Sequence, residues 1–434
     1  MTTTFDKKAV VSNRIYLKAD KALQDKLNDE LTYIIPTYGI DQPSLVIKNI
    51  GRINKDLVSI PVGRRDLVPE DYEIIDKTLL APMTMPKFKF ELRASQQDVY
   101  DKVTGNTIIN APPSWGKTFT ALAIVAKLAQ KTLIVVHTIA LRDQWVKEIE
   151  YTMGFKPGII GSGKLELDPP IVVGNVQTLT KKVPDIRDLF GTIVLDEMHH
   201  VSSPTFAKIV DKLPARYKIG LSGTLKRKDG KHVVFNDYFG YDVHIPPKEN
   251  YMVPRIATVR SDIRFPDGAR TPWAKRVNVV AYDPNYQSLI AQIASVYAAK
   301  GHKVLVVSDR VQFLKNCAEL TGDRAICVTG ELPHELREGE LQKIKEDEAD
   351  VLYGTQSIFC EGISLNELSV LILGTPINNE PLLIQLIGRV IRKQEGKLQP
   401  VVVDIHLKGK TATAQASARM GVYISEGYEI KNYT

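Results

Sequence analysis

From Leu92 onward, short and almost continuously apolar segments alternate with amphipathic stretches along the chain. Such segments are typical of parallel strands buried on both faces, with helices between them. They form two series, comprising residues 107–111, 132–137, 171–175, 192–197 and 217–223, and then 303–309, 325–330, 350–355, 370–375 and 400–406. The pattern predicts an α/β fold with parallel-sheet lobes at 86–245 and 273–434. A polar, proline-containing connection is expected at 246–272.

The first 85 residues follow a different pattern, which predicts a small N-terminal α+β accessory domain. A strand-like segment at 14–19 precedes a helix-like segment at 20–35, where Leu23, Leu27, Leu31 and Ile34 recur at helical spacing. Extended segments follow at 45–50 and 57–62, and the proline-marked stretch 79–90 predicts a linker. This domain is too apolar and too regular for a disordered tail.

Composition narrows the class of protein only slightly. The 434 residues are 44% hydrophobic and 25% charged, and 57 Lys and Arg against 50 Asp and Glu give a net charge of +7. That excess permits a polyanionic partner without demonstrating one. The three cysteines have no zinc-site spacing, and no apolar run approaches the length of a membrane helix. We therefore expect a cytoplasmic protein with reduced thiols.

The clearest candidate site is the segment Ala111–Thr118, APPSWGKT, which joins a predicted strand to a predicted helix. This is the context of a phosphate-binding loop, in which backbone N–H groups and the helix N-terminus hold phosphates. Lys117 would reach the β- and γ-phosphates of ATP, and the Thr118 hydroxyl would bind Mg²⁺. Ala111 stands where the general pattern begins with glycine. The alternative is a chance Gly-Lys-Thr on a surface loop.

A second candidate site follows about 80 residues later, where the apolar segment TIVL ends in Asp196 and Glu197. Carboxylates at the carboxyl edge of a parallel sheet lie where ligands bind. Asp196 would hold Mg²⁺, and Glu197 would orient and deprotonate an attacking water. His199 would link this site to the cleft between the lobes. A solvated helix start is the alternative, but a buried strand directly before the pair makes it improbable.

With these two motifs the chain resembles the superfamily 2 helicases, whose two RecA-like lobes share one ATP. Arg93 and Gln96 match the element upstream of the loop, whose glutamine reads adenine. Pro113, Ser114, Trp115, Gly116 and Phe119 occupy the nucleotide-binding positions around Lys117. In the second lobe QLIGRVIR provides Gln385, Arg389 and Arg392, and the resemblance implies that one of these arginines faces the γ-phosphate. Gly362 would let the backbone approach the nucleotide. The resemblance covers Leu92 to the C-terminus.

The same resemblance implies a nucleic-acid path across both lobes. Candidate contacts are Thr138, Arg142, Gln177, Thr178, Arg227, Ser308, Arg310 and Thr355. No recognition helix or aromatic-interleaved basic tract is visible, so we expect contacts mainly to the backbone. The basic cluster around Arg227 could equally be a solvated loop.

Two short segments narrow the resemblance to the XPB/UvsW-like branch, which includes bacteriophage recombination helicases. These are TLKRKDG, at 224–230, and ARMGVYISEGYEI, at 418–430. The branch implies a DNA helicase or translocase that remodels forks and Holliday junctions, acts as a monomer and works in the host cytoplasm. An RNA helicase of the DExH type, a nucleotide-gated binding module and the motor subunit of a restriction system remain alternatives. The N-terminal domain would either grip duplex DNA or cap the first lobe.

Overall fold

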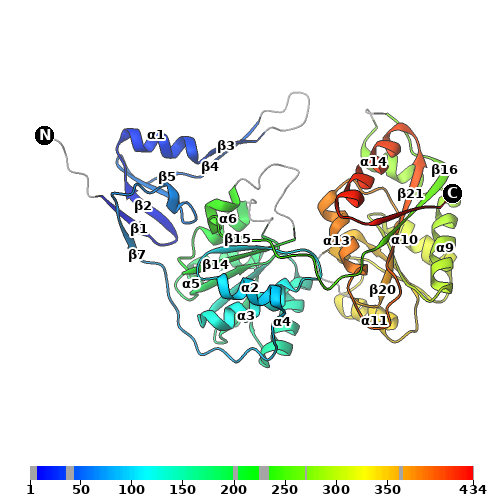
Figure 1. The fold of residues 1–434 in the computed structure, drawn as a ribbon, viewed down its shortest axis with the longest axis horizontal. Helices are drawn as coiled ribbons and strands as arrows, with labels where there is room; N and C mark the ends of the chain where they lie inside the picture. Colours follow the sequence, from blue (N-terminus) through cyan, green and yellow to red (C-terminus); the bar gives the residue numbers. More distant parts are fainter. Residues whose placement is uncertain are drawn as a thin grey trace. The chain divides into compact units, whose positions relative to one another are not determined.

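The computed structural model describes residues 7–35, 44–198, 204–223, 234–268, 271–360 and 365–433. The chain divides into two compact units, Met1–Lys248 and Glu249–Thr434, and each is described by itself (Figure 1). The first unit contains both the N-terminal segment and the first series of apolar strands.

A small, mainly antiparallel sheet forms the beginning of the first unit. Its strand order is β5-β6-β2-β1-β7, and the short strands β3 and β4 form a separate antiparallel pair. The elements are β1 (Lys8–Val11), β2 (Arg14–Lys18), α1 (Lys21–Glu30), β3 (Thr32–Ile35), β4 (Leu45–Lys48), β5 (Gly51–Arg52), β6 (Leu57–Pro61), the short 3-10 helix η1 (Arg65–Leu67) and β7 (Glu73–Asp76).

The helix expected at 20–35 is shorter than its apolar spacing predicts. It ends at Glu30, and Thr32–Ile35 form β3, on which Ile34 is 69% exposed. The reason is the run of β-branched and aromatic side chains at 32–35, which favours an extended strand once β4 is available to pair with it. The prediction of one continuous helix was therefore wrong.

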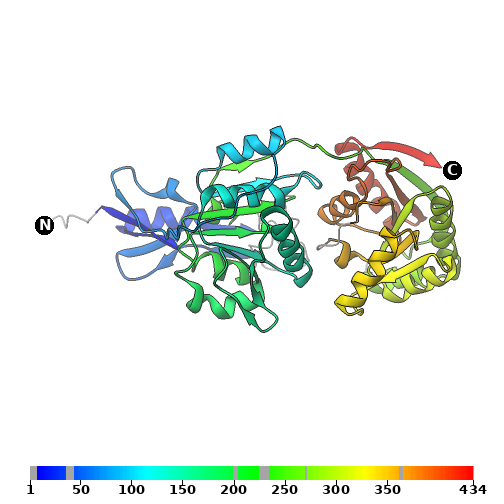
Figure 2. The same ribbon diagram turned by 90° about the horizontal axis from the view of Figure 1, so that it is seen from below.

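The rest of the first unit is a sheet in the order β11-β10-β12-β9-β13-β14-β8-β15, parallel except for the β10–β11 pair. Helices cover both of its faces (Figure 2). The elements are α2 (Ala94–Lys102), β8 (Thr107–Asn110), α3 (Lys117–Leu128), β9 (Thr132–Val136), α4 (Ile139–Met153), β10 (Gly158–Gly161), β11 (Lys164–Leu165), β12 (Ile171–Asn175), α5 (Val176–Ile186), β13 (Thr192–Leu195), α6 (Pro204–Val210), β14 (Tyr217–Ser222), α7 (Phe235–Phe239) and β15 (Val243–His244). The parallel lobe predicted from the apolar strands is confirmed.

The second unit is a parallel sheet in the order β18-β19-β17-β20-β21-β16-β22, again with an apolar core on each face. Its elements are β16 (Arg255–Arg264), α8 (Trp273–Ala281), α9 (Pro284–Ala299), β17 (Lys303–Ser308), α10 (Val311–Thr321), β18 (Ala325–Val328), α11 (His334–Lys345), β19 (Val351–Thr355), α12 (Gln356–Cys360), β20 (Leu368–Leu373), α13 (Glu380–Val390), β21 (Val401–Lys408), α14 (Lys410–Ser425) and β22 (Glu429–Tyr433).

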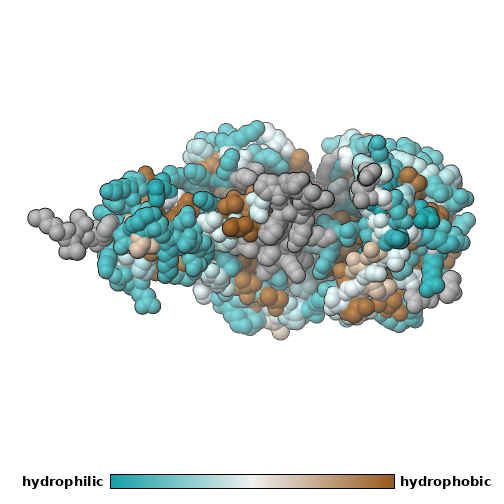
Figure 3. Space-filling model, turned by 90° about the horizontal axis from the view of Figure 1, so that it is seen from above, coloured by the Kyte–Doolittle hydropathy of each residue, from teal (hydrophilic) through white to brown (hydrophobic). Residues whose placement is uncertain are grey.

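The segment expected as a connection, 246–272, contributes a strand to the second sheet. Arg255–Arg264 form β16, which pairs in parallel with β21 and β22. Three arginines and Asp262 lower the hydrophobicity of this segment, so its apolar pattern did not indicate a strand, although Ile256 is fully buried. Apolar side chains are gathered in the cores of both units, and the face seen in Figure 3 is largely hydrophilic with scattered apolar residues.

The N-terminal sheet and its hairpin are bound to the first lobe by a buried carboxylate on α7. The carboxylate of Asp237, which is fully buried, accepts hydrogen bonds from the Tyr33 hydroxyl at 2.7 Å and from the Asn49 amide at 2.8 Å. The N–H of Gly63 donates to the Asp237 carbonyl at 2.9 Å. A Cβ at Gly63 would lie 2.1 Å from the Asn236 carbonyl oxygen, so this approach requires glycine.

Candidate nucleotide and nucleic-acid sites

The segment Ala111–Thr118 forms a tight turn between β8 and α3. Ser114 and Gly116 both have positive φ, 70° and 93°, and α3 starts at Lys117 directly after the turn. Ser114 stands where many superfamily 2 helicases have glycine, and its left-handed backbone is one that glycine adopts most easily. Because the turn ends at a helix N-terminus, its N–H groups provide the setting in which phosphates bind.

Side chains from α2 hold this turn in place. The Trp115 ring is fully buried, and its Nε1–H donates to Ser95 Oγ at 2.8 Å. The amide of Gln96 donates to the Trp115 carbonyl at 2.9 Å, and the Arg93 guanidinium donates to the same oxygen. A Cβ on Gly116 would lie 2.8 Å from Gln96 Nε2. The structure thus brings together Arg93, Gln96 and the loop, which the sequence placed in one nucleotide site.

Lys117 lies at the start of α3, with Thr118 and Phe119 in the same first turn. Its Nζ donates to the Ala111 carbonyl at 3.2 Å, so the ammonium folds back over the loop it would serve. The end of β14 lies alongside, since a Cβ on Gly223 would be 3.5 Å from Lys117 Nζ. The Lys117 ammonium therefore lies over the Ala111–Thr118 turn and does not extend into solvent.

Asp196 and Glu197 follow β13, which lies between β9 and β14 in the sheet. Asp196 is only 6% exposed, and its carboxylate accepts hydrogen bonds from the Trp145 indole at 2.8 Å and from the Glu197 N–H at 3.0 Å. Burial, followed by repulsion from Glu197, raises the pKa of Asp196 against the opposing effects of Trp145 and Lys117. Glu197 has a positive φ of 50°, an uncommon backbone for a non-glycine residue.

These residues fit Mg²⁺, which the resemblance implies. Among the described residues no group of three or more His, Cys, Asp or Glu could hold a metal ion. Mg²⁺ usually needs only one or two protein oxygens, because it keeps several waters and the oxygens of substrate phosphates. A buried carboxylate at Asp196 and the hydroxyl of Thr118 match that requirement. The charge of such an ion would offset the cost of burying the carboxylate.

The arginine motif lies on α13 of the second unit. Gln385 and Arg389 are four residues apart and share one face of the helix, and Arg389 is in its last turn. Arg392 follows the helix and donates to Asn366 Oδ1 at 3.4 Å. Burial, and then the charge of Arg392, lowers the pKa of nearby Lys397 to about 8. This end of α13 therefore concentrates positive charge.

The candidate nucleic-acid contacts divide into surface and interior positions. Gln177 is exposed and Thr178 half-buried in the first turn of α5, and Thr138 caps α4 by accepting from the Leu141 N–H at 3.2 Å. Arg310 is the N-cap residue of α10, and its partly covered guanidinium pairs with Asp309 and donates to Asn278 at 2.6 Å. For these positions the contact stays a prediction.

Three other candidates are buried, which argues against direct contact with nucleic acid. Arg142 is 7% exposed, and its guanidinium donates to Ser162 at 2.9 Å and pairs with Asp143. Ser308 is fully buried and shares a 3.0 Å hydrogen bond with Thr375, and Thr355 is 8% exposed. Motif order placed them beside a ligand, but sequence order carries no information on side-chain burial. His199, Arg227 and Gly362 lie outside the described residues.

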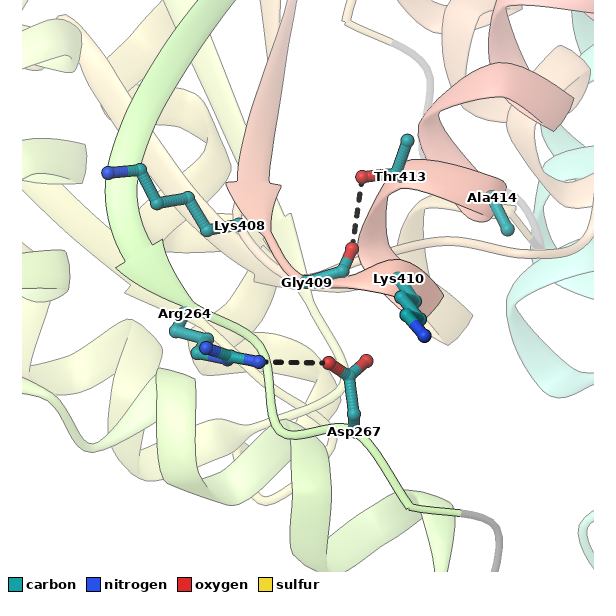
Figure 4. Close-up of a pocket in the computed structure, with 7 residues that line it drawn as sticks. All are labelled: Arg264, Asp267, Lys408, Gly409, Lys410, Thr413 and Ala414. Carbon is teal, nitrogen blue, oxygen red and sulfur yellow. Dashed lines mark hydrogen bonds and ion pairs between the residues drawn. The ribbon is translucent and has the colours of Figure 1, made fainter.

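A separate cavity of about 590 Å³ lies at the start of α14 in the second unit (Figure 4). Arg264, Lys408 and Lys410 line it, which would suit an anion. However, the Asp267 carboxylate accepts from the Thr411 N–H at 3.1 Å and from Arg264 at 3.4 Å. A protein carboxylate thus already satisfies the helix start, and this cavity is no candidate for the phosphates.

Two protein families match the chain. "Type III restriction enzyme, res subunit" matches residues 89–227, and "Helicase conserved C-terminal domain" matches residues 286–394. The probable helicase D10 of Escherichia phage T5 is 44% identical over 430 residues, covering 97% of this chain and 95% of that protein. The chain is a superfamily 2 helicase.

More distant helicases carry names that refer to different nucleic acids. A putative ATP-dependent RNA helicase, L396, of Acanthamoeba polyphaga mimivirus is 27% identical and covers 79% of this chain and 69% of its own. The ATP-dependent DNA helicase uvsW of Enterobacteria phage T4 is 26% identical and covers 70% of this chain and 65% of its own. The helicase family implies use of ATP. In the part of the chain that the structure describes, no helix has the length and apolar character to cross a membrane.

The sequence motifs did not reveal the role of Trp145. Only the structure shows that its indole donates to the carboxylate of Asp196. No sequence signal joins two residues that are 51 positions apart.

Proposed function

We propose that this helicase is an ATP-dependent DNA translocase that remodels forks and four-way junctions in recombination, repair or replication. The observation that carries the proposal is the cluster of Lys117, Asp196 and Glu197 beside the phosphate-binding turn. We propose that the chain acts as a monomer. We also propose that it works in the cytoplasm of a phage-infected host, because a 44% identical relative is a phage protein.

In the proposed mechanism, the turn and the N-terminus of α3 bind the phosphates of ATP, and Lys117 contacts the β- and γ-phosphates. Asp196 and Thr118 would hold Mg²⁺, which would supply positive charge against the phosphate oxygens. Glu197 orients a water and takes its proton. Arg389 or Arg392 adds charge from the second lobe, so that hydrolysis depends on the lobes coming together.

DNA is favoured over RNA by the name of the T4 relative and by the branch that the two short segments resemble. The mimivirus relative keeps an RNA helicase as the second candidate. We propose contacts mainly to the backbone, through Thr138, Gln177, Thr178 and Arg310, so affinity would fall steeply with salt.

Branch migration suits a motor of this kind on energetic grounds. Each step breaks a base pair in one arm and makes one in another, so that ~1.4 kcal/mol of stacking per base-pair step is lost and regained. The N-terminal domain would grip duplex beside the branch point. Its attachment through Asp237 supports this role, because a firmly attached domain can transmit force to the first lobe.

The same attachment supports the cap function as well. A chain starting near Pro86 would leave the buried Asp237 carboxylate without Tyr33 and Asn49, so it is expected to lose thermal stability. Truncation alone therefore cannot separate the two functions, and the full chain should be used in all assays.

The test compares a fork, a Holliday junction and a tailed duplex with ATP, alongside ATPase assays stimulated by DNA or RNA. The expected result is remodelling of the branched substrates and stimulation by DNA. Glu197→Gln is the matched control, because the amide keeps the shape of the side chain and loses its basicity. It should bind Mg-ATP without remodelling DNA. Stimulation by RNA alone, or unwinding of the tailed duplex with no activity on junctions, would overturn the proposal.

A further inference from the structure

One hydrogen bond joins the helix that carries a proposed nucleic-acid contact to the carboxylate proposed to hold Mg²⁺. The Trp145 indole, 1% exposed, donates from Nε1 to Asp196 Oδ2 at 2.8 Å. The ring is held by the apolar core on one face of the first sheet, which includes Leu141 and Ile149 of the same helix. Packing in this core therefore fixes the position of the indole relative to α4.

The elements on either side of this bond are adjacent in the sheet. β9 leads into Thr138, the N-cap of α4, and β13 leads into Asp196. The two strands pair in parallel, with Leu195 opposite Val135, and the Asp196 N–H donates to the Val135 carbonyl at 3.1 Å. Trp145 lies about two turns along α4 from Thr138. A shift at the start of α4 would therefore change the aim of the indole at Asp196.

We propose that Trp145 is a positioning residue that orients the Asp196 carboxylate for Mg²⁺ and couples nucleic-acid binding at the start of α4 to ATP hydrolysis. The coupling rests on the proposed function, because it requires a nucleic-acid contact near Thr138. The orientation of Asp196 in the free protein does not.

The physical argument concerns a buried anion with few partners. The groups that face Asp196 are the Trp145 indole, the Lys117 ammonium and Glu197. The indole N–H donates to Oδ2 at 2.8 Å and the Glu197 N–H donates to Oδ1 at 3.0 Å, so each oxygen of the carboxylate has its own donor. Loss of the indole donor would leave Oδ2 without that hydrogen bond and the carboxylate free to rotate. Partners that orient metal ligands in this way typically contribute 10–100-fold to metal affinity.

The first test compares Trp145→Phe with Ile149→Val. The phenylalanine keeps an aromatic ring and removes the N–H, whereas the valine trims the same buried face of α4 without touching Asp196. Binding of a fluorescent ADP is titrated with Mg²⁺. Trp145→Phe should raise the Mg²⁺ concentration for half-maximal binding about tenfold, and Ile149→Val should not change it. Equal Mg²⁺ dependence in the folded variants would overturn the positioning role.

The second test follows the ¹⁹F signal of Trp145 itself, so it needs no substitution at that position. The chain has three tryptophans, so 5-fluorotryptophan labelling should yield three ¹⁹F signals. Trp115→Phe and Trp273→Phe identify the Trp145 signal by elimination. Asp196→Asn should shift that signal in the free protein. Adding single-stranded DNA without nucleotide should also shift it.

The outcomes separate this inference from the proposed function. DNA binding by fluorescence anisotropy with an unmoved Trp145 signal would overturn the coupling and leave the proposed function standing. No DNA binding at all would remove the proposed function and the coupling together. The Mg²⁺ titration would still decide whether Trp145 positions Asp196.

Discussion

Two aspartates, one in each lobe, are buried to a similar degree but have different kinds of hydrogen-bond partner. Asp196 follows β13 and is 6% exposed, and Asp404 lies within β21 and is 1% exposed. The carboxylate of Asp404 accepts hydrogen bonds from Nε and Nη2 of Arg419, at 2.9 Å and 2.7 Å, and another from the Tyr423 hydroxyl at 3.0 Å. Asp196 accepts from an indole and a backbone N–H.

The electrostatic consequence follows from these partners. Burial by itself would raise the pKa of both carboxyl groups. At Asp404 the Arg419 guanidinium outweighs burial, and the pKa lies below its usual value. At Asp196 burial and Glu197 prevail, and the pKa is raised. In the second lobe, Arg419 thus neutralises the buried carboxylate of Asp404 and stabilises the fold. In the first lobe, no arginine pairs with Asp196 among the described residues, and a bound cation could neutralise it.

The substitution with the largest expected effect is Lys117→Ala, which removes a positive charge that acts on Asp196. The Lys117 ammonium lies over the Ala111–Thr118 turn. Its removal should lower ATPase activity by at least roughly 10²–10³-fold, since it would contact the charge that develops on the phosphates. The melting temperature should stay close to wild type. Normal hydrolysis by a cooperatively folded mutant would refute the phosphate-loop assignment.

Arg419→Met tests the other lobe, where the expected loss is in stability. It leaves the Asp404 carboxylate buried without its cation, which should lower the free energy of unfolding by about 3–5 kcal/mol. Denaturant unfolding measures the loss. The double variant Asp404→Asn/Arg419→Met is the control and should regain much of it, because no unpaired charge remains. An unchanged midpoint in the single variant would show that the ion pair is dispensable.

The variants Arg389→Ala and Arg392→Ala test whether ATP hydrolysis beside Asp196 needs positive charge from the second lobe. Nucleotide affinity should be nearly unchanged, and turnover should fall by up to ~10³-fold for the residue that faces the γ-phosphate. Binding of a fluorescent nucleotide and steady-state ATPase assays separate the two effects. Weakened affinity with normal turnover in both variants would contradict an interlobe role.

The smallest expected effect is on the pH dependence of stability. Because the pKa of Asp404 is lowered, its contribution is present above the unfolded pKa and is lost as pH falls through the folded pKa. The raised pKa of Asp196 has the opposite sign, and stability falls as pH rises through it. Without Mg²⁺, Asp196→Asn should therefore melt at a higher temperature than wild type at neutral pH, with the difference closing at acidic pH. A lower melting temperature at neutral pH would show that the Asp196 charge is stabilising.

The sequence alone determined much of the nucleotide site. Apolar strands reveal their burial locally, so both parallel sheets and the position of Ala111–Thr118 between a strand and a helix could be predicted. The backbone at Ser114 also agrees with a position where related proteins use glycine. These features depend on residues that are neighbours in the sequence, and a sequence motif consists of such residues.

The tertiary structure alone decided which distant side chains meet. Trp145 reaches Asp196 across 51 positions, and Tyr33 reaches Asp237 across 204, through packing of separate elements. Strand pairing also produced structure that local patterns did not predict. Ile34 fits a helical pattern but lies on β3, which pairs with β4. The polar segment Arg255–Arg264 forms a strand because it pairs with β21. Arg142 is likewise buried by a tertiary contact, since its partner Ser162 lies in the turn between β10 and β11. Local periodicity indicates which segments have an apolar face, whereas the partner of each side chain depends on how whole elements pack.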